Sequence, residues 1–305
     1  MDNNSFSLTA LGAAFMRGYH ARHDDPKIFH DPLAYGLLTE KERFLIARHW
    51  LNRLQSADAE GAKMCPDEAS ALRRALQIWT GASVVLSRAR YAEEALREGI
   101  GRGIRQYVIL GAGMDTFAFR CPEAMEKVEV FEVDHPATQT FKRNRIAELG
   151  WKIPSGLHFV PLDFTESSLG EMKSHSPYNP AGLTFFSWLG VTYYLSRKTV
   201  LDTLAAVARI SPPESMVVFD YLGPRVASSR IAAKRLKAIG DSLRDLGEPL
   251  KTGFDPAALG ADLARSGLRL VEDLAPSDIQ RRYFDGRTDG YRASEHIRFA
   301  LAAVK

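Results

Sequence analysis

The sequence predicts an α/β fold in which helices cover both faces of a mostly parallel sheet. Short apolar runs alternate with helical patterns from residue 106 onward, as is typical of a doubly wound sheet. A glycine loop follows the first of these runs, and carboxylates end the next two. About a hundred residues with helical periodicity precede the first run, which is more than the sheet itself needs.

The expected elements alternate between strands and helices along the chain. Short apolar runs predict strands near 106–111, 128–134, 157–162, 183–189, 215–221, 268–274 and 297–304. Longer stretches with a helical period predict helices between them, near 136–149, 197–210 and 255–266. The order of these elements indicates that the strands form one open sheet.

The segment ahead of the sheet is expected to form a helical cap. Helical patterns extend over 32–54 and 67–98, so residues 1–105 would cover the ligand-binding edge of a core made by 106–305. A basic amphipathic run follows the fifth strand, and we expect this insertion, near 224–252, to complete the lid. No repeat or flexible linker interrupts the pattern, which predicts a single domain over 1–305.

Composition argues against several classes of function. The net charge of +3 is small and its cations are scattered, so nucleic acid is not an expected partner. No apolar run approaches the roughly 20 residues that cross a bilayer, so no membrane is expected either. The two cysteines, Cys65 and Cys121, and the eight histidines show no metal-ligand spacing. We therefore expect a cytoplasmic protein without a metal.

The glycine loop consists of Gly111, Ala112 and Gly113. Glycines let the backbone approach a ligand without a Cβ in the way. A loop that binds a dinucleotide would carry a third glycine, but Thr116 stands in its place. Asp115 would repel a pyrophosphate and attract the ammonium group of S-adenosylmethionine, which has no phosphate. The loop favours S-adenosylmethionine, and the alternative interpretation is a tight turn in which Asp115 caps a helix.

Several sequence blocks resemble one known family. They are Tyr107–Arg120 (YVILGAGMDTFAFR), Val130–Pro136 (VFEVDHP), Pro161–Phe164 (PLDF) and Trp188–Ser196 (WLGVTYYLS). In order and spacing they resemble the bacterial branch of the leucine carboxyl methyltransferase family, whose members are class I S-adenosylmethionine-dependent methyltransferases. The resemblance implies a Rossmann-like seven-stranded domain that binds S-adenosyl-L-methionine, releases S-adenosyl-L-homocysteine and uses no metal.

Carboxylates at strand ends are the expected contacts of the nucleoside. Asp134 ends the second strand, where open α/β sheets bind ligands, and is expected to accept from the ribose hydroxyls. Glu132 points to the same face two residues earlier and is the second choice. The resemblance places the adenine against Asp163 and Phe164. The alternative is that these carboxylates are surface caps.

Two arginines ahead of the sheet are candidates for binding the methionine carboxylate. Ser87–Glu94 (SRARYAEE) resembles the helix in which the family places such an arginine, which assigns the role to Arg88 and, as a second choice, to Arg90. A planar guanidinium binds a carboxylate with two parallel hydrogen bonds. Arg17 is a weaker second anchor from the cap. A solvated helix face is the alternative for each arginine.

The fourth strand is expected to form the floor below the methyl group. Trp188 would lie beside the cofactor and, with Tyr193, shape the acceptor pocket, although a core role is the alternative for this aromatic pair. Many relatives carry a glutamate where Leu189 stands, which removes one base candidate. If a base is needed, the candidates are His20, Tyr193 and Tyr194, with His23 and His30 also available.

The sequence thus predicts an S-adenosylmethionine-dependent O-methyltransferase. Its expected acceptor is a carboxylate or hydroxyl of a small molecule, such as an acid or phenol of specialised metabolism. A protein C-terminal carboxyl methyltransferase and a non-catalytic S-adenosylmethionine-binding protein are the alternatives. A nicotinamide-dependent dehydrogenase is disfavoured by Asp115 and by the missing third glycine.

Overall fold

The computed structural model describes residues 7–164, 168–223 and 249–305. Its centre is a seven-stranded sheet in the order β3-β2-β1-β4-β5-β7-β6. The strands are β1 Gln106–Leu110, β2 Glu129–Asp134, β3 Leu157–Pro161, β4 Thr184–Trp188, β5 Met216–Leu222, β6 Leu268–Leu274 and β7 Ile297–Val304. The predicted strands are all present, and the α/β fold class is confirmed.

The sheet is parallel except at one strand. β1 to β5 pair in parallel, whereas β7 pairs antiparallel with both β5 and β6. The order of the strands reverses between β1 and β4, which are neighbours although β2 and β3 lie between them in sequence. Ligands bind in the crevice outside the carboxyl ends of the strands at such a reversal.

The helices ahead of the sheet form the cap and its connection to the core. They are α1 Leu8–His23, α2 Glu40–Ala57, α3 Ala59–Lys63, α4 Glu68–Ile78 and α5 Thr80–Gly101. The pattern at 32–54 begins too early, because Thr39 and Glu42 form a capping box that starts α2. The pattern at 67–98 covers two helices, because the extended backbone of Trp79 separates α4 from α5.

The later helices connect the strands. They are α6 Phe117–Arg120, α7 Pro122–Met125, α8 Pro136–Glu148, α9 Met172–His175, α10 Arg197–Ile210, α12 Pro256–Arg265 and α13 Pro276–Tyr283, with 3-10 turns at Leu169–Glu171 and Thr192–Tyr194. The three helices predicted in this part of the chain are present within one residue of their expected ends. The structure adds α13 and the short helices α6, α7 and α9, and in the cap it adds α1 and α3.

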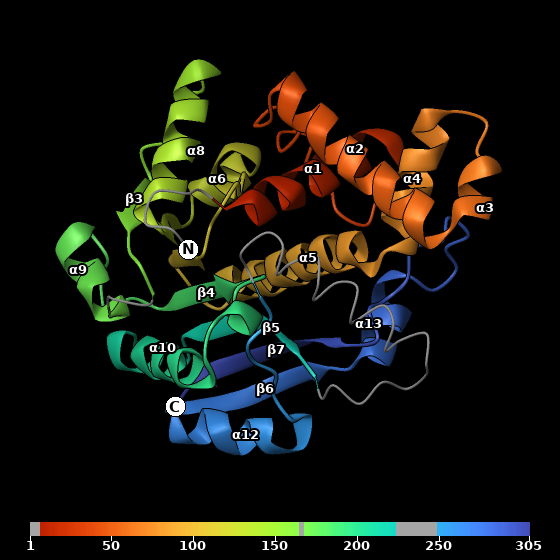
Figure 1. Cartoon of the computed structure of the whole chain (residues 1–305). Helices are drawn as coiled ribbons and strands as arrows, with labels where there is room; N and C mark the ends of the chain where they lie inside the picture. Colours follow the sequence, from red (N-terminus) through yellow and green to blue (C-terminus); the bar gives the residue numbers. More distant parts are fainter. Residues whose placement is uncertain (1–6, 165–167, 224–248) are drawn as a thin grey trace.

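Helices cover both faces of the sheet (Figure 1). On one face, Tyr107 and Val218 belong to a hydrophobic cluster that also contains residues of α5 and α13. On the other face, Val108 and Phe186 belong to a second cluster with residues of α10 and α12. Alternate residues of one strand therefore enter different clusters, as expected for a sheet that is buried on both sides.

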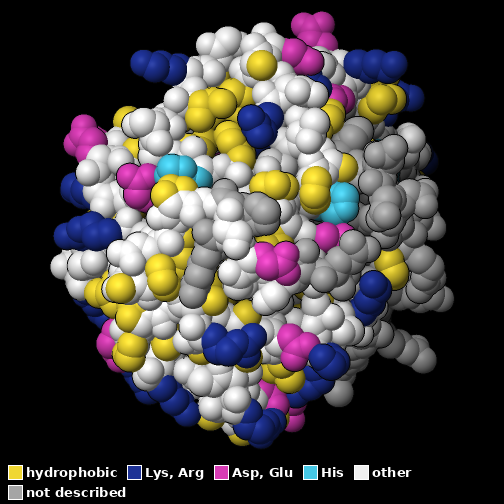
Figure 2. Space-filling model, turned by 90° about the vertical axis from the view of Figure 1, so that its left-hand side faces the viewer, with side chains coloured by type: hydrophobic (Ala, Val, Ile, Leu, Met, Phe, Trp, Pro, Cys, Tyr) yellow, Lys and Arg dark blue, Asp and Glu magenta, His cyan; other side chains and the backbone are white. Residues whose placement is uncertain are grey.

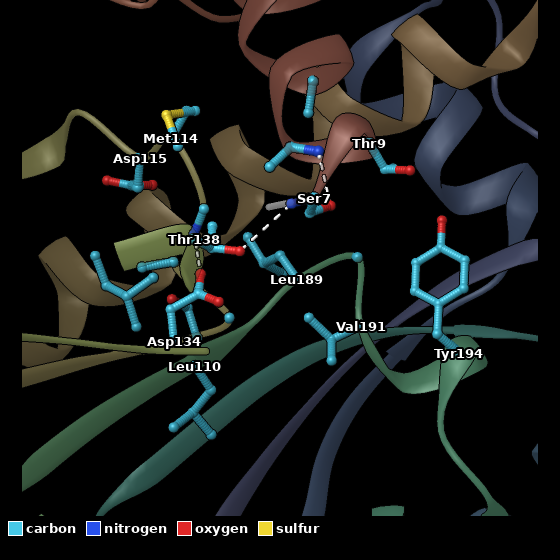
Figure 3. Close-up of a pocket in the computed structure, with 18 of the residues that line it drawn as sticks. Ser7, Thr9, Leu110, Met114, Asp115, Asp134, Thr138, Leu189, Val191 and Tyr194 are labelled. Carbon is cyan, nitrogen blue, oxygen red and sulfur yellow. Dashed lines mark hydrogen bonds between the residues drawn. The ribbon is translucent and has the colours of Figure 1, made fainter. Parts of the chain in front are cut away.

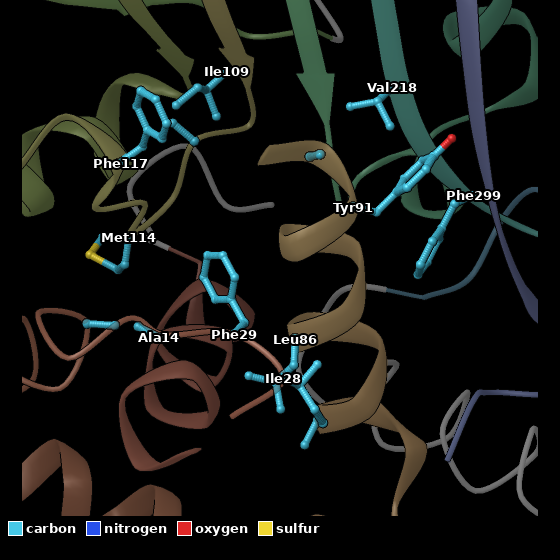
Figure 4. Packing of buried hydrophobic residues seen from close by; sticks show 14 of the residues in the cluster. Ala14, Ile28, Phe29, Leu86, Tyr91, Ile109, Met114, Phe117, Val218 and Phe299 are labelled. Atoms are coloured by element: carbon cyan, nitrogen blue, oxygen red, sulfur yellow. The ribbon is translucent and has the colours of Figure 1, made fainter. Parts of the chain in front are cut away.

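The cap shares the first of these clusters with the sheet. Figure 4 shows Ala14 and Phe29 of the cap near Leu86 of α5, and Tyr91 of α5 beside Phe299 of β7. The rings of Tyr91 and Phe299 stack with centroids 5.6 Å apart. Each buried apolar side chain contributes about 1.5–3 kcal/mol to the stability of the fold. Because cap and sheet share one cluster, the same hydrophobic contacts stabilise both.

The expected lid near 224–252 lies largely outside the described residues. Its described end, residues 249–252, passes beside the turn that follows β4. The N–H groups of Lys251 and Thr252 donate to the carbonyl of Tyr193 at 2.7 and 3.3 Å.

On the face shown in Figure 2, basic side chains are interspersed with acidic and hydrophobic ones.

The packing of α1 generates a test of the cap. A Cβ at Gly18 would lie 2.5 Å from the backbone nitrogen of Tyr35, whereas a Cβ at Gly12 of the same helix would meet nothing within 4 Å. We expect Gly18→Ala to lower the free energy of unfolding by about 1–3 kcal/mol, because the backbone must shift. Gly12→Ala should raise it by roughly 0.5–1 kcal/mol. Urea unfolding measures both, and equal effects would contradict this packing.

Candidate functional site

A cavity of about 480 Å³ opens at the carboxyl ends of β1, β2 and β4. Its walls come from the glycine loop, the ends of β2 and β3, the turn after β4, and helices α1 and α5 (Figure 3). The predicted cofactor residues that line it are Arg17, Arg88, Gly111, Ala112, Gly113, Asp115, Asp134, Asp163 and Phe164. Glu132 and Trp188 do not line it.

The glycine loop needs its glycines for conformation and for space. Gly111 and Gly113 have φ values of +69° and +51°, which other residues rarely adopt. A Cβ at Gly111 would lie 2.5 Å from a methyl carbon of Val191, and one at Gly113 would lie 3.1 Å from Ala10 of α1. Asp115 lines the cavity and also accepts the N–H of Phe117 at 2.7 Å, so it caps the following turn as well.

The carboxylate of Asp134 holds the glycine loop at the end of β2. It accepts the N–H of Gly113, and that of His135 at 2.6 Å. Figure 3 shows this carboxylate below the loop, beside Leu110 and Thr138. Burial raises the pKa of Asp134, although both N–H groups lower it. A ligand that donates hydrogen bonds to Asp134 would favour its charged form.

Asp163 and Phe164 follow β3 and line the same cavity. The ring nitrogen Nε2 of His135 lies 3.6 Å from Oδ2 of Asp163, so the residues after β2 and β3 meet here. The ring of Phe164 packs on Trp188, with centroids 6.1 Å apart. Trp188 is fully buried in the cluster between the sheet and α10. It therefore supports Phe164 from behind, which corrects the prediction that it contacts the cofactor.

Glu132 also lies behind the site. Its carboxylate is fully buried and receives a hydrogen bond from Nζ of Lys142 in α8 at 2.5 Å. Burial raises the pKa of Glu132 to about 7, against the opposing charge of Lys142. Glu132 shares a face with Asp134, as strand alternation predicted, but it is covered by α8. The second-choice ribose role is thereby corrected.

The structure places one of the three candidate bases away from the cavity and two near it. His20 is buried, with Nδ1 2.8 Å from Oδ2 of Asp24 and Nε2 accepting the N–H of Ile28 at 2.7 Å. It lines neither this cavity nor the second one, which adjoins it, and this corrects its prediction as a base. Tyr194 lines the cavity described above, whereas Tyr193 does not line it but accepts a hydrogen bond from Arg88, which does.

Sequence reasoning missed a buried ionic cluster around Asp31, which also lines the cavity. Oδ2 of Asp31 accepts from Nε of Arg17 at 2.8 Å, and Oδ1 accepts from the hydroxyl of Thr116 at 2.7 Å. Arg120 lies 3.7 Å away and is also paired with Glu93. Arg17 further donates to the carbonyl of Met114 at 2.6 Å, so this cluster connects α1 to the glycine loop. No motif marks Asp31 in the sequence.

Arg88 lies at the other side of the cavity and is paired with Asp220 of β5. Its Nη1 donates to Oδ2 of Asp220 at 3.0 Å and to the hydroxyl of Tyr193 at 2.9 Å. Asp220 also accepts the N–H of Gly190 at 2.6 Å. A Cβ at Gly190 would lie 2.4 Å from Nη2 of Arg88, so the guanidinium can cross this turn only over a glycine. Arg90, the second choice, instead pairs with Glu94 at 2.8 Å.

A second cavity, of about 410 Å³, adjoins the first. Both cavities are lined by Thr9, Ala13, Val85, Arg88, Gly190 and Tyr194. The remaining wall of the second cavity is mostly apolar and includes Leu11, Met16, Ile46, Trp50, Trp79 and Leu222. Leu8 and Leu45 line its mouth and are about half exposed, at 52% and 55%. Two compartments thus meet beside Arg88.

The described residues give two further observations. Among them, no group of three or more histidine, cysteine, aspartate or glutamate side chains is placed to hold a metal ion. None of the helices in these ranges is both long and apolar enough to cross a membrane.

The sheet order, the glycine loop after β1 and the carboxylates after β2 and β3 define a class I methyltransferase. Two solved structures share the fold. A protein titled as a putative methyltransferase from Thermobifida fusca is 14% identical, with a TM-score of 0.57 over 95% of this chain and 94% of that one. A DUF574 family protein from Streptomyces avermitilis is 13% identical, with a TM-score of 0.55 over 96% and 97%.

Sequence comparison identifies the family. The model for leucine carboxyl methyltransferase matches residues 10–208. The "Putative S-adenosyl-L-methionine-dependent methyltransferase YktD" of Bacillus subtilis (strain 168) is 36% identical over 309 residues, which cover 100% of both chains. The chain therefore belongs to the leucine carboxyl methyltransferase family and is an S-adenosylmethionine-dependent methyltransferase.

The Asp31 cluster predicts a pH-dependent contribution to stability. Burial raises the pKa of Asp31, but Arg17 and Arg120 lower it, and the net value is below the ordinary 3.8. We expect Asp31→Asn to lower the free energy of unfolding by about 3–5 kcal/mol at pH 7, because it leaves buried cations unpaired.

The sign of the pH effect follows from the lowered pKa. The stability that the Asp31 carboxylate contributes is fully present above the unfolded-state pKa and is lost as pH falls through the folded-state pKa. Urea unfolding at several pH values should show the difference between wild type and Asp31→Asn shrinking below about pH 3.8. A difference that stays constant to pH 2 would contradict the assignment.

Proposed function

We propose that this enzyme transfers the methyl group to an oxygen atom of a small apolar molecule, at a carboxylate or a hydroxyl. The observation that carries the proposal is the meeting of two cavities beside Arg88, Gly190 and Tyr194. One cavity has the polar groups that a nucleoside and an amino acid require, and the other is mostly apolar. The volume of the second cavity, about 410 Å³, suits a small molecule.

The first cavity fits S-adenosylmethionine in shape and in chemistry. Its glycine loop leaves no room for a Cβ at Gly111 and little at Gly113, and Asp134 presents a carboxylate to which ribose hydroxyls would donate. Asp163 and Phe164 would hold the adenine. Arg88 uses Nη1 for Asp220, and its Nη2 and Nε have no partner among the described residues, which supports a contact with the methionine carboxylate. Arg17 is the second candidate for that contact.

Bound S-adenosylmethionine supplies an electrophilic methyl group on a sulfonium. An acceptor oxygen would displace the neutral thioether from this methyl group, and a hydroxyl acceptor would also release its proton to a base or to water. Since charge is lost in this step, positioning the acceptor and excluding water contribute most of what the protein supplies. The apolar wall of the second cavity supports both.

Tyr193 is better suited to positioning than to acting as a base. Burial and the charge of Asp220 raise the pKa of Tyr193 above its ordinary value, so its hydroxyl is protonated at neutral pH. A carboxylate acceptor is already ionised and needs no base. For a phenol or alcohol, Tyr194 remains the candidate that lines both cavities.

The ribose role of Asp134 predicts a loss of cofactor affinity. Asp134→Asn should weaken binding of S-adenosylhomocysteine about tenfold or more, because charge-assisted hydrogen bonds contribute roughly 1.5–3 kcal/mol each. Isothermal titration calorimetry measures the affinity. Glu129→Gln, on the exposed start of the same strand, is the matched control and should bind as wild type does. An affinity within twofold for Asp134→Asn would remove the assignment.

The proposed activity predicts which compounds are methylated. Labelled methyl transfer to a panel of apolar acids, phenols and alcohols should yield methyl esters or ethers. With an acid acceptor, the rate should be flat between about pH 6 and 9, because the carboxylate is already ionised. A phenol, whose pKa is about 10, should react faster as the pH rises.

Two other outcomes of that experiment would overturn the proposal. Transfer confined to peptides with a free C-terminal carboxylate, and lost on their amidated forms, would indicate a protein carboxyl methyltransferase. Binding of S-adenosylmethionine without transfer to any acceptor would indicate a non-catalytic binding protein.

A further inference from the structure

The second cavity holds one positive charge that no described carboxylate balances. Its acidic and basic lining residues are Glu42, Arg53 and Arg88, together with His49 and His296. Glu42 receives a hydrogen bond from Arg145 at 3.0 Å, and Arg88 is paired with Asp220 at 3.0 Å. Arg53 forms no ion pair with any carboxylate in the described ranges. Among the described residues that line this mostly apolar cavity, Arg53 is therefore the one arginine or lysine without a carboxylate partner.

Arg53 is held against aromatic walls of the same cavity. Its guanidinium carbon lies 4.3 Å from the ring centroid of Trp79 and 5.5 Å from that of Trp50. These contacts fix the direction of the side chain while its N–H groups stay available, because ring faces attract the cation without accepting all of its hydrogen bonds. Half-burying an arginine without a carboxylate costs free energy, and an anionic ligand would offset that cost.

A neighbouring histidine supports this interpretation. His49 lies one turn earlier on α2 and also lines the second cavity. Burial and the charge of Arg53 lower the pKa of His49 below 6.5, so the imidazole is neutral at neutral pH. Arg53 is therefore the cation that an acidic ligand would meet, and His49 offers a neutral hydrogen-bonding group beside it.

The position of Arg53 separates it from the reacting oxygen. Arg88, Gly190 and Tyr194 line both cavities, whereas Arg53 lines only the second. A group bound at Arg53 is thus held away from the junction at which the methyl group would be delivered. A guanidinium binds a carboxylate with two parallel hydrogen bonds, which fixes both its position and its orientation.

We propose that Arg53 binds a carboxylate of the methyl acceptor that is separate from the methylated oxygen. The acceptor class is then an apolar, for example aromatic, acid with a hydroxyl or a second carboxylate at its other end. This inference rests on the proposed function, since it takes the second cavity to be the acceptor site. Arg53 is a specificity-determining residue in this proposal and takes no part in the bond exchange.

The test compares acids with neutral amides of the same shape. The probes are 4-phenylbutanoate and 4-phenylbutanamide, 3-(4-hydroxyphenyl)propanoate and its amide, each added to the full chain saturated with S-adenosylhomocysteine. Trp50 and Trp79 line the cavity, so quenching of tryptophan fluorescence reports binding. We expect wild type to bind each acid about tenfold or more tightly than its amide. Equal affinities in wild type would overturn the proposal without any variant.

Matched variants identify the residue responsible. Arg53→Gln should bind acid and amide equally, with the amide affinity unchanged, and Arg53→Lys should retain part of the preference. Arg48→Gln is the control, because Arg48 is exposed on the same helix and lines neither cavity. A preference for acids that survives in Arg53→Gln would overturn the assignment to Arg53.

Separate measurements distinguish failure of the Arg53 proposal from failure of the proposed function. S-adenosylhomocysteine affinity should be the same in wild type and in the Arg53 variants, because Arg53 does not line the first cavity. Methyl transfer to acids and amides alike, at similar kcat/KM, would retain the small-molecule function and reject the role of Arg53. Selective acid binding without transfer to any small acceptor would reject the function instead.

Discussion

The buried carboxylate of Asp31 connects the cap to the glycine loop. It receives hydrogen bonds from Arg17 of α1, from Thr116 beyond the loop and from the N–H of Ala34, and Arg120 lies close by. A carboxylate that is almost fully buried is stable only when its acceptor positions are filled by donors and its charge is balanced. The cap, the loop and the sheet edge must therefore keep fixed positions relative to one another. The first cavity is the space that this arrangement encloses.

The strands and the glycine loop could be predicted from the local sequence pattern. Which of their side chains face the cavity and which are buried behind it could not. Alternation places Glu132 and Asp134 on one face of β2, but it does not say that α8 covers only Glu132 and brings Lys142 to it. Trp188 ends a strand just as Asp134 does, yet its ring turns into the core beneath Phe164. Contacts between distant segments decide these cases, and a single sequence carries no local signal for them.

The sequence did not reveal which side chains are partners in the folded chain, whether they lie near or far along it. Asp31 is bound by Arg17 and by Arg120, and Arg88 is bound by Asp220, which is 132 positions away. Family resemblance marked Arg88 but gave no reason to single out Asp220. His20 was a reasonable base candidate by residue type, and only its two buried hydrogen bonds remove it. The sequence gives the chemical properties of each side chain, but only the structure gives its hydrogen-bond and ion-pair partners.

The Asp220 carboxylate fixes Arg88, which lines both cavities, and Tyr193, which lines the second, in one hydrogen-bonded unit. Arg88, the N–H of Gly190 and the hydroxyl of Tyr193 all bind it. If Arg88 binds the cofactor as proposed, replacing Tyr193 to admit another acceptor would also disturb the position of that arginine. The aromatic walls supplied by α2 and by Trp79 make none of the hydrogen bonds to Asp220 found among the described residues. Under the proposed function, libraries for directed evolution of new acceptor preferences belong on those cap walls, because their side chains can be varied without breaking the hydrogen bonds to Asp220.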